Sequence, residues 1–147
     1  MKLVDANVLL YAVNTSSHQH AVAHRWLDTA LVGDETVGLP WLSLIAFVRL
    51  ATHPTIFPTP LSTDSAISQV EEWLETPAAT VCEPGRHHLQ LWRQALDAAG
   101  AGGNLVNDAH LAALAIEHNA TIVTYDRDFS RFPRIEWRTP AQLLPAD

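Results

Sequence analysis

The sequence predicts an α/β fold with a mostly parallel sheet, formed by one domain over residues 1–147. Two observations support this prediction. Short apolar segments alternate with amphipathic stretches of about 10–15 residues, which is the pattern of strands joined by crossover helices. The length of 147 residues suits a single domain, and no internal repeat, low-complexity tract or linker divides the chain.

The N-terminal part begins with a short apolar segment at residues 2–5, which ends in a carboxylate and predicts a buried strand. A short helix is expected over residues 7–13. Polar residues 14–17 end it and supply Ser and Thr caps for a longer helix over residues 18–31, in which apolar side chains recur every three or four positions.

The next part of the chain predicts a second strand at residues 36–39. Pro40 suits the first position of a helix that reaches residue 52, because proline already has a helical φ and needs no N–H partner there. Residues 53–62 contain three prolines and predict irregular structure. A further helix is capped within residues 62–64 and ends before Pro77.

In the C-terminal half, residues 79–82 predict a third strand, and a helix over residues 86–99 is closed by glycine-rich residues 100–103. A strongly periodic helix over residues 104–118 follows, with Asn119 as its C-terminal cap. The fourth and fifth strands are expected at residues 121–124 and 135–137.

The composition excludes several classes of protein. With 48% hydrophobic and 17% charged residues, the chain has enough apolar surface to fold. A net charge of −7 argues against a generally basic protein that coats nucleic acid, and one cysteine excludes a disulfide framework or a cysteine-based zinc site. No apolar run is long enough for a membrane span or a signal peptide, so we expect a cytoplasmic protein with no membrane contact.

Carboxylates follow the expected central strands. Asp5 closes the first strand, and Asp126 and Asp128 directly follow the fourth. Asp108 lies near the start of the preceding helix, on its apolar face, and therefore points toward the sheet. Because sites in parallel sheets form outside the C-terminal ends of strands, we expect these separate segments to aim their carboxylates at one place.

Clustered carboxylates repel one another unless a cation neutralises them. Hard oxygen ligands with no cysteine suit Mg²⁺ or Mn²⁺, and such a site can activate water for attack on a phosphodiester. The plainer interpretation is that each Asp is only a helix cap or a turn residue. Convergence of three segments favours the metal site over that interpretation.

Three motifs resemble those of PIN-domain nucleases: residues 4–10 (VDANVLL), 107–115 (NDAHLAALA) and 121–129 (TIVTYDRDF). The resemblance covers essentially the whole chain and is strongest to the VapC toxins of bacterial VapBC toxin–antitoxin systems. It implies a three-layer αβα sandwich with a four- to five-stranded sheet. It also implies a Mg²⁺- or Mn²⁺-dependent endoribonuclease that cleaves structured RNA such as transfer or ribosomal RNA, forms a homodimer and is inhibited by a cognate antitoxin.

The resemblance assigns roles to individual residues. Asp5, Asp108 and Asp126 match catalytic, metal-binding acids, and Asp128 is a further candidate ligand. The residues placed to hold carboxylates or water by hydrogen bonds, if they are not caps, are Asn7, Asn104 and Thr124.

One position departs from the family pattern. The family usually has a Glu on the helix after the second strand, and Ala46 aligns with it here. No acid occurs between Glu35 and Asp64, so Ser43 or water is left to complete the site. This leaves open whether one or two ions bind, and it leaves open weak or lost activity.

Four of the nine basic residues follow the last acidic motif: Arg127, Arg131, Arg134 and Arg138. They are either a solvated surface or a phosphate-binding strip beside the metal site, which Arg25 and Arg49 could extend. The eight histidines give weaker signals. His20 and His24 are spaced for zinc but lack a third ligand nearby, His88 is expected to be exposed, and His110 to lie near the mouth of the acidic site.

Two rival functions remain at this stage. Asp5 followed by Asn7 resembles the nucleophile loop of haloacid dehalogenase-like phosphotransferases, but those enzymes need a second Asp there and a separate lysine, whereas Lys2 is the only lysine and lies in the first strand. The other rival is a PIN-like module that binds RNA or protein and has lost its chemistry with the missing Glu.

Overall fold

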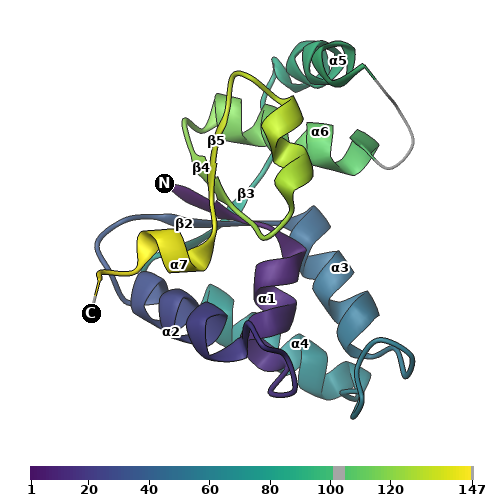
Figure 1. Ribbon diagram of the computed structural model, residues 1–147, viewed down its shortest axis with the longest axis vertical. Helices are drawn as coiled ribbons and strands as arrows, with labels where there is room; N and C mark the ends of the chain where they lie inside the picture. The colour runs from purple at the N-terminus through teal and green to yellow at the C-terminus, as the bar shows by residue number, and fades with distance from the viewer. Residues whose placement is uncertain (101–104, 147) are drawn as a thin grey trace.

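The computed structural model describes residues 1–100 and 105–146, and it contains one parallel sheet (Figure 1). Each neighbouring pair of strands is parallel, and the order across the sheet is β3-β2-β1-β4-β5. The α/β prediction is therefore confirmed. The strands are β1 (Lys2–Val4), β2 (Val37–Pro40), β3 (Ala79–Cys82), β4 (Thr121–Val123) and β5 (Glu136–Arg138).

Helices cover both faces of this sheet, as the three-layer expectation requires. In Figure 1, one layer lies below the sheet and consists of α1 (Ala6–Val13), α2 (His20–Leu31), α3 (Trp41–Ala51), α4 (Thr63–Leu74) and the short α7 (Pro140–Leu143). The layer above it consists of α5 (His88–Ala99), α6 (Leu105–Glu117) and the 3-10 helix η1 (Arg127–Arg131).

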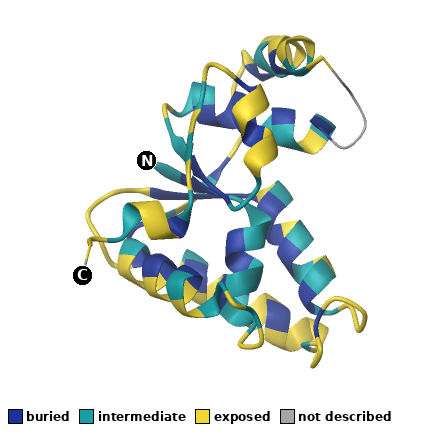
Figure 2. Cartoon of the chain, in the orientation of Figure 1, coloured by how far each residue is buried: buried dark blue, intermediate teal, exposed yellow. Residues whose placement is uncertain are grey.

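The alternation of side chains along the strands separates two hydrophobic cores. Val4 and Val123 pack into the core between the sheet and helices α1 to α4, whereas their neighbours Leu3 and Ile122 pack into the core between the sheet and helices α5 and α6. All four are fully buried. Burial on both faces explains why these strands are continuously apolar rather than alternating with polar residues. Figure 2 shows the largely buried central strands between helices whose outer faces are exposed.

Most element boundaries fall within one or two residues of the expectation, and the third strand matches it in full. Pro40 is an exception, because it ends β2 opposite Cys82 and caps α3 instead of starting the helix. Its extended ψ of 148° allows both roles. The expected Ser or Thr cap of α2 is also wrong, since the helix begins after Gln19, whose N–H is accepted by the Ser17 hydroxyl at 3.1 Å.

The remaining expectations concern short segments. Asn119 follows α6 with a left-handed φ of 50°, as its capping role requires, and Gly100 ends α5 with φ 71°. The rest of the glycine-rich segment and Asn104 lie outside the described residues. Two elements were not expected from the sequence, η1 and α7, and both are too short to show a periodic pattern. No helix among the described residues is long and apolar enough to cross a membrane.

Candidate active site

Carboxylates from three separate segments meet at the C-terminal ends of the two central strands. Asp5 links β1 to α1 and caps the helix, and Asp126 follows β4 and caps η1. Asp108 lies in the first turn of α6. Because β1 and β4 are parallel neighbours, with Val4 opposite Val123, their following residues emerge side by side. The structure thus brings the expected residues together.

The Asp5 carboxylate is held from several directions. Its Oδ1 accepts a hydrogen bond from the Ala6 N–H at 2.8 Å, and its Oδ2 accepts from the Thr124 hydroxyl at 2.8 Å and from Asn7 Nδ2 at 3.2 Å. Burial raises the pKa of Asp5 above its usual value, although these hydrogen bonds lower it in part. The carboxylate is therefore fixed in one orientation before any ligand arrives.

Thr124 connects the segments that carry the acids. Its fully buried hydroxyl donates to Asp5 and accepts from the Asp126 N–H at 3.0 Å and from Asn7 Nδ2 at 3.2 Å. The Asn7 side-chain carbonyl in turn accepts from the Tyr125 N–H at 3.1 Å. The expectation that Asn7 and Thr124 hydrogen-bond a carboxylate is confirmed, and Thr124 also orients the backbone before Asp126.

Asp108, Asp126 and Asp128 form the densest group of acids in the described part of the chain. Each offers one ligand atom, and these atoms all lie within 4.8 Å of one another. Burial raises the pKa of Asp108 to about 7, with further contributions from the charges of Asp126, Asp5 and Asp128. An acid that resists ionisation beside other acids is the electrostatic signature of a site that a cation would stabilise.

A cavity of about 350 Å³ lies between α3 and two of the acids, Asp5 and Asp108. Asp5 and Asp108 line one side, and the α3 residues Ser43, Ala46 and Arg49 line the other. The methyl group of Ala46 therefore faces the site where the family pattern places a carboxylate. The sequence predicts Ser43 only as a substitute for the missing carboxylate. The structure adds that its hydroxyl is buried and has no hydrogen-bond partner among the described residues.

The polar contacts of His20, His24, His88 and His110 are made with residues outside the acidic cluster. His20 Nδ1 contacts the Tyr11 carbonyl at 2.9 Å and His24 pairs with Asp28 at 3.2 Å, so the two are engaged separately. The expectation that His88 is exposed is wrong, because it is 9% exposed between α5 and α6. His110 packs against it, with 2.9 Å between His88 Nε2 and His110 Nδ1. Their 22-residue separation gave no local sequence signal.

The arginines after the last acidic motif do not form one uniform strip. Arg127 and Arg131 lie exposed on η1, which begins directly after Asp126. Arg134 donates to Gln94 at 3.1 Å, and Arg138 pairs with Glu136 at 3.1 Å. Arg127 and Arg131 are therefore the pair placed nearest the carboxylates along the chain, and Arg49 lies on the opposite wall of the cavity.

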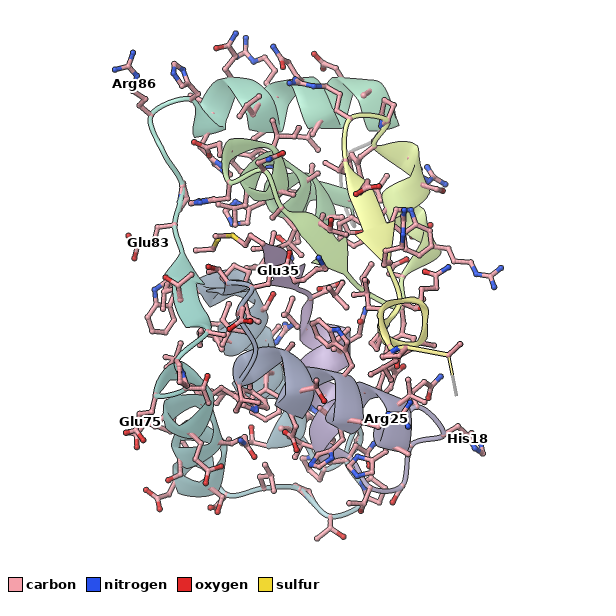
Figure 3. All side chains as sticks on the ribbon, turned by 90° about the vertical axis from the view of Figure 1, so that its left-hand side faces the viewer. His18, Arg25, Glu35, Glu75, Glu83 and Arg86 are labelled. Carbon is pink, nitrogen blue, oxygen red and sulfur yellow. The ribbon has the colours of Figure 1, made fainter. Side chains whose placement is uncertain are left out.

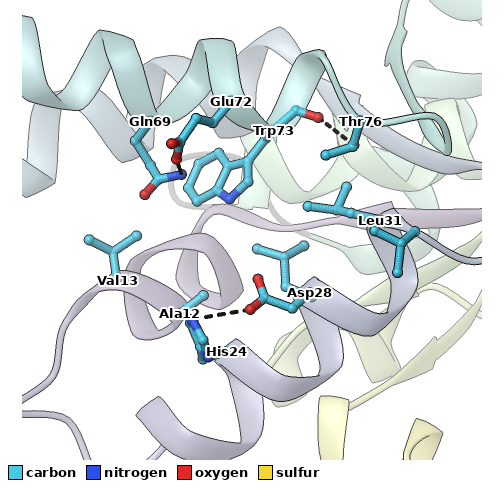
Figure 4. Close-up of a pocket in the computed structure, with 11 residues that line it drawn as sticks. Ala12, Val13, His24, Asp28, Leu31, Gln69, Glu72, Trp73 and Thr76 are labelled. Atoms are coloured by element: carbon cyan, nitrogen blue, oxygen red, sulfur yellow. Dashed lines mark hydrogen bonds and ion pairs between the residues drawn. The ribbon is translucent and has the colours of Figure 1, made fainter.

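A cavity of about 590 Å³, larger than the acidic one, lies between α1, α2 and α4 (Figure 4). Its polar side chains are already engaged with one another, since Asp28 pairs with His24 and Glu72 accepts from Gln69 at 3.2 Å. The acidic cavity is smaller but holds the repelling, incompletely partnered groups. Chemistry is therefore expected there and not in the larger cavity.

The single lysine bears on the haloacid dehalogenase-like alternative. Lys2 Nζ lies 2.8 Å from Glu35 Oε1, and the amino terminus lies 3.0 Å from the same oxygen. Figure 3 labels this Glu35, which precedes β2. Lys2 is thus engaged at the N-terminal ends of the strands, opposite the end where Asp5 lies. It does not assist Asp5, so that alternative lacks its required lysine as well as its second Asp.

Comparison with known proteins points to one family. The PIN domain matches residues 2–135. The chain is 54% identical to the ribonuclease VapC37 of Mycobacterium tuberculosis, across 98% of this chain and the whole of that protein. It is 39% identical to the ribonuclease VapC33 of the same species, across 95% of this chain and 98% of that protein.

Solved structures show the same fold at low identity. The VapBC2 structure from Rickettsia felis, bound to a promoter DNA fragment, includes a chain with a TM-score of 0.69 at 19% identity, covering 94% of this chain and 97% of that one. VapC20 of Mycobacterium tuberculosis, described as a toxin that cleaves the sarcin–ricin loop, gives a TM-score of 0.64 at 17% identity, covering 88% of this chain and 93% of that one.

Proposed function

The chain belongs to the PIN-domain family and is a homologue of the VapC ribonucleases, and from this premise we propose that it is a metal-dependent endoribonuclease, the toxin of a toxin–antitoxin pair. Its substrate is structured RNA of the transfer or ribosomal class. The observation that carries the proposal is the convergence of Asp5, Asp108 and Asp126 at one edge of the sheet.

The residues present fit a divalent cation such as Mg²⁺ or Mn²⁺. The donors are carboxylate oxygens, which are the ligands these hard ions prefer, and three of them lie within 4.8 Å of one another. The pKa of Asp108 is raised first by burial and then by the charges of Asp126, Asp5 and Asp128, and a bound cation would oppose both effects. When bound, the ion would lower the pKa of water and neutralise charge that develops on a phosphodiester.

The protein's own groups divide the remaining work. Asp108 and Asp126 would hold the cation, with the exposed Asp128 as a further oxygen donor. Asp5 would face the ion in a fixed orientation, because Thr124, Asn7 and the Ala6 N–H hold its oxygens. Such preorganisation avoids reordering the ligands during the reaction.

RNA would be held through its phosphates. Arg127 and Arg131 are exposed next to the last acidic motif, and Arg49 lies on the cavity wall. Phosphate contacts of this kind position a substrate without reading its sequence. Because the whole chain carries a net charge of −7, binding would depend on these local contacts and on the cation.

We propose that the protein forms a homodimer and binds a cognate antitoxin, and that it acts in the cytoplasm. A shallow apolar groove lined by Trp41, Ile45 and Ile67 adjoins the acidic cavity, and Ile45 and Arg49 line both. Trp41 and Ile45 are 49% and 62% exposed, and apolar patches of this kind favour a protein partner. An antitoxin seated in the groove would also cover the mouth of the acidic cavity.

Cleavage of total RNA by the purified protein tests the enzymatic proposal. Wild-type protein with Mn²⁺ or Mg²⁺ should cleave, whereas the Asp5→Asn and Asp108→Asn variants and protein with EDTA should not. Equal cleavage by all three proteins would indicate a contaminating nuclease and sink the site assignment.

The second candidate, a PIN-like module that binds RNA or protein without cleaving it, is favoured by one observation. Ala46 lines the acidic cavity where the family pattern has Glu. This module would show no cation-dependent cleavage in the same assay while still binding RNA or its partner. A gain of cleavage in an Ala46→Glu variant of an otherwise silent protein would support it directly.

A further inference from the structure

The α3 wall of the acidic cavity contains a buried hydroxyl group that makes no hydrogen bond with the described residues. Ser43 is 1% exposed, and its Oγ has no hydrogen-bond partner among the described residues. It does not bond back to the carbonyl of the preceding helical turn, as helical serines often do. Buried polar atoms without partners are rare, and each calls for an explanation such as a ligand that completes it.

The surroundings of Ser43 indicate the chemistry of its missing hydrogen-bond partner. Ser43 lines the same cavity as Asp5 and Asp108, and Ala46, which follows one turn later on α3, contributes only a methyl group. The acids therefore lie on one side of the cavity, and the opposite wall lacks a carboxylate. On that wall the neutral Ser43 oxygen and the Arg49 guanidinium are the polar side-chain groups, and a cation would favour the oxygen.

We infer that Ser43 is a positioning residue that accepts a hydrogen bond from a water molecule in the hydration shell of a divalent cation held by the carboxylates. This inference rests on the proposed function. Mg²⁺ and Mn²⁺ keep several waters when few carboxylates bind them. Those waters are polarised donors and need acceptors. The small Ala46 side chain leaves space for one, and Ser43 Oγ provides the acceptor on the α3 side.

This role makes a prediction that a purely structural serine would not. Removing the hydroxyl also removes an unpartnered polar atom, so the cation-free Ser43→Ala protein should be as stable as wild type or more stable. The same variant should bind the cation less tightly, because partners of the ligand shell typically contribute about 10- to 100-fold to metal affinity. If Ser43 only filled space, Ser43→Ala would lower the stability of the protein and leave its cation affinity unchanged.

The test measures Mn²⁺ binding to metal-free protein by the loss of the free-ion electron paramagnetic resonance signal, with thermal melts in EDTA alongside. Ser43→Ala should weaken Mn²⁺ binding about tenfold without lowering the melting temperature. Ser68→Ala, which removes an exposed hydroxyl on α4, is the matched control and should bind like wild type. Adding Ala46→Glu to Ser43→Ala should restore the affinity, because a carboxylate would then occupy the same wall.

Two different failures can be told apart. If wild type binds Mn²⁺ and Asp108→Asn does not, but Ser43→Ala binds within twofold of wild type, the Ser43 inference is overturned and the proposed function stands. If wild type binds no Mn²⁺ at all, both are overturned. A Ser43→Ala protein that melts earlier than wild type and binds Mn²⁺ normally would show that the serine only supports packing.

Discussion

Helix α6 carries two polar clusters of opposite character. Near its N-terminal end, Asp108 faces Asp126 and Asp128, and the charges of these groups oppose one another. On its other side, His110 and the last residue, Glu117, contact His88 of α5. Each cluster includes side chains that are buried or partly buried, so burial alone does not distinguish them. The difference lies in whether the polar atoms satisfy one another.

The histidine cluster is internally complete. His88 Nδ1 lies 2.8 Å from Glu117 Oε1, His88 Nε2 lies 2.9 Å from His110 Nδ1, and Glu117 Oε2 accepts from the Gly85 N–H at 2.9 Å. These contacts join α5 to α6 and stabilise the layer above the sheet. The acidic cluster instead consists of carboxylate acceptors that cannot satisfy one another. An ion or protons must supply the positive charge that they lack. The comparison shows how one helix separates structural from chemical polar groups.

The largest effect should come from the acidic cluster. Asp108→Asn keeps the shape of the side chain but removes a charged ligand, so cation-dependent RNA cleavage should fall by about 10³-fold. Single-turnover cleavage of a defined RNA measures this loss. Asp97→Asn, an exposed acid on α5, is the matched control and should cleave like wild type. Comparable losses in the two variants would mean that the Asp108 carboxylate has no special role.

Disrupting the histidine cluster should lower the stability of the fold and leave cation binding unchanged. Glu117→Ala leaves His88 and the Gly85 N–H without their partner, and we expect the free energy of unfolding to fall by about 2–3 kcal/mol. Urea denaturation measures the change. Glu83→Ala, at an exposed position labelled in Figure 3, should change stability little. Mn²⁺ affinity should stay at the wild-type value in both variants, and a loss of affinity in Glu117→Ala would contradict the separation of the two clusters.

The same contrast explains what could be predicted from the sequence. The acids follow apolar strands or begin a periodic helix, so the topology of a parallel sheet was enough to place Asp5, Asp108 and Asp126 at one edge. The contact between His88 and Glu117 depends on the docking of two helices across 29 residues of sequence, and no spacing rule reports that. The free hydroxyl of Ser43 likewise depends on packing around α3 and is visible only in three dimensions.

A smaller effect is expected in the pH dependence of stability without cation. The pKa of Asp108 is about 7 in the fold against 3.8 ordinarily, so between these values the folded state binds more protons. Stability from this group is fully present below about pH 4 and is lost as the pH rises through about 7. In EDTA, Asp108→Asn should therefore melt about 2–4 °C above wild type at pH 8, a difference near 1 kcal/mol, and the gap should close at acidic pH.

Saturating Mn²⁺ should reduce the difference in melting temperature between Asp108→Asn and wild type at pH 8, because the ion stabilises only the protein that binds it. Wild type should gain stability at pH 8, and Asp108→Asn should gain little. Thermal melts with and without Mn²⁺ provide the measurement. Equal gains by both proteins would place the ion elsewhere.

The smallest effects should come from the arginines of η1. Arg127→Ala and Arg131→Ala should each weaken RNA binding a few-fold and reduce the dependence of affinity on salt by about one counterion. Filter binding to a catalytically silent Asp108→Asn background measures both. Arg86→Ala, at an exposed position away from η1, is the control and should leave the salt slope unchanged. An unchanged slope in the η1 variants would remove these arginines from the proposed RNA surface.

The hydrogen bond from Thr124 to Asp5 spans 119 residues of the sequence. During synthesis, the first residues of the chain leave the ribosome long before β4 and Asp126 exist. An emerging chain therefore carries Asp5 without the Thr124 hydroxyl that orients it, and the carboxylate cluster can assemble only after Asp126 and Asp128 have been made. A growing chain would therefore lack the assembled acidic site, and ribonuclease activity would arise only after residue 126 has been made.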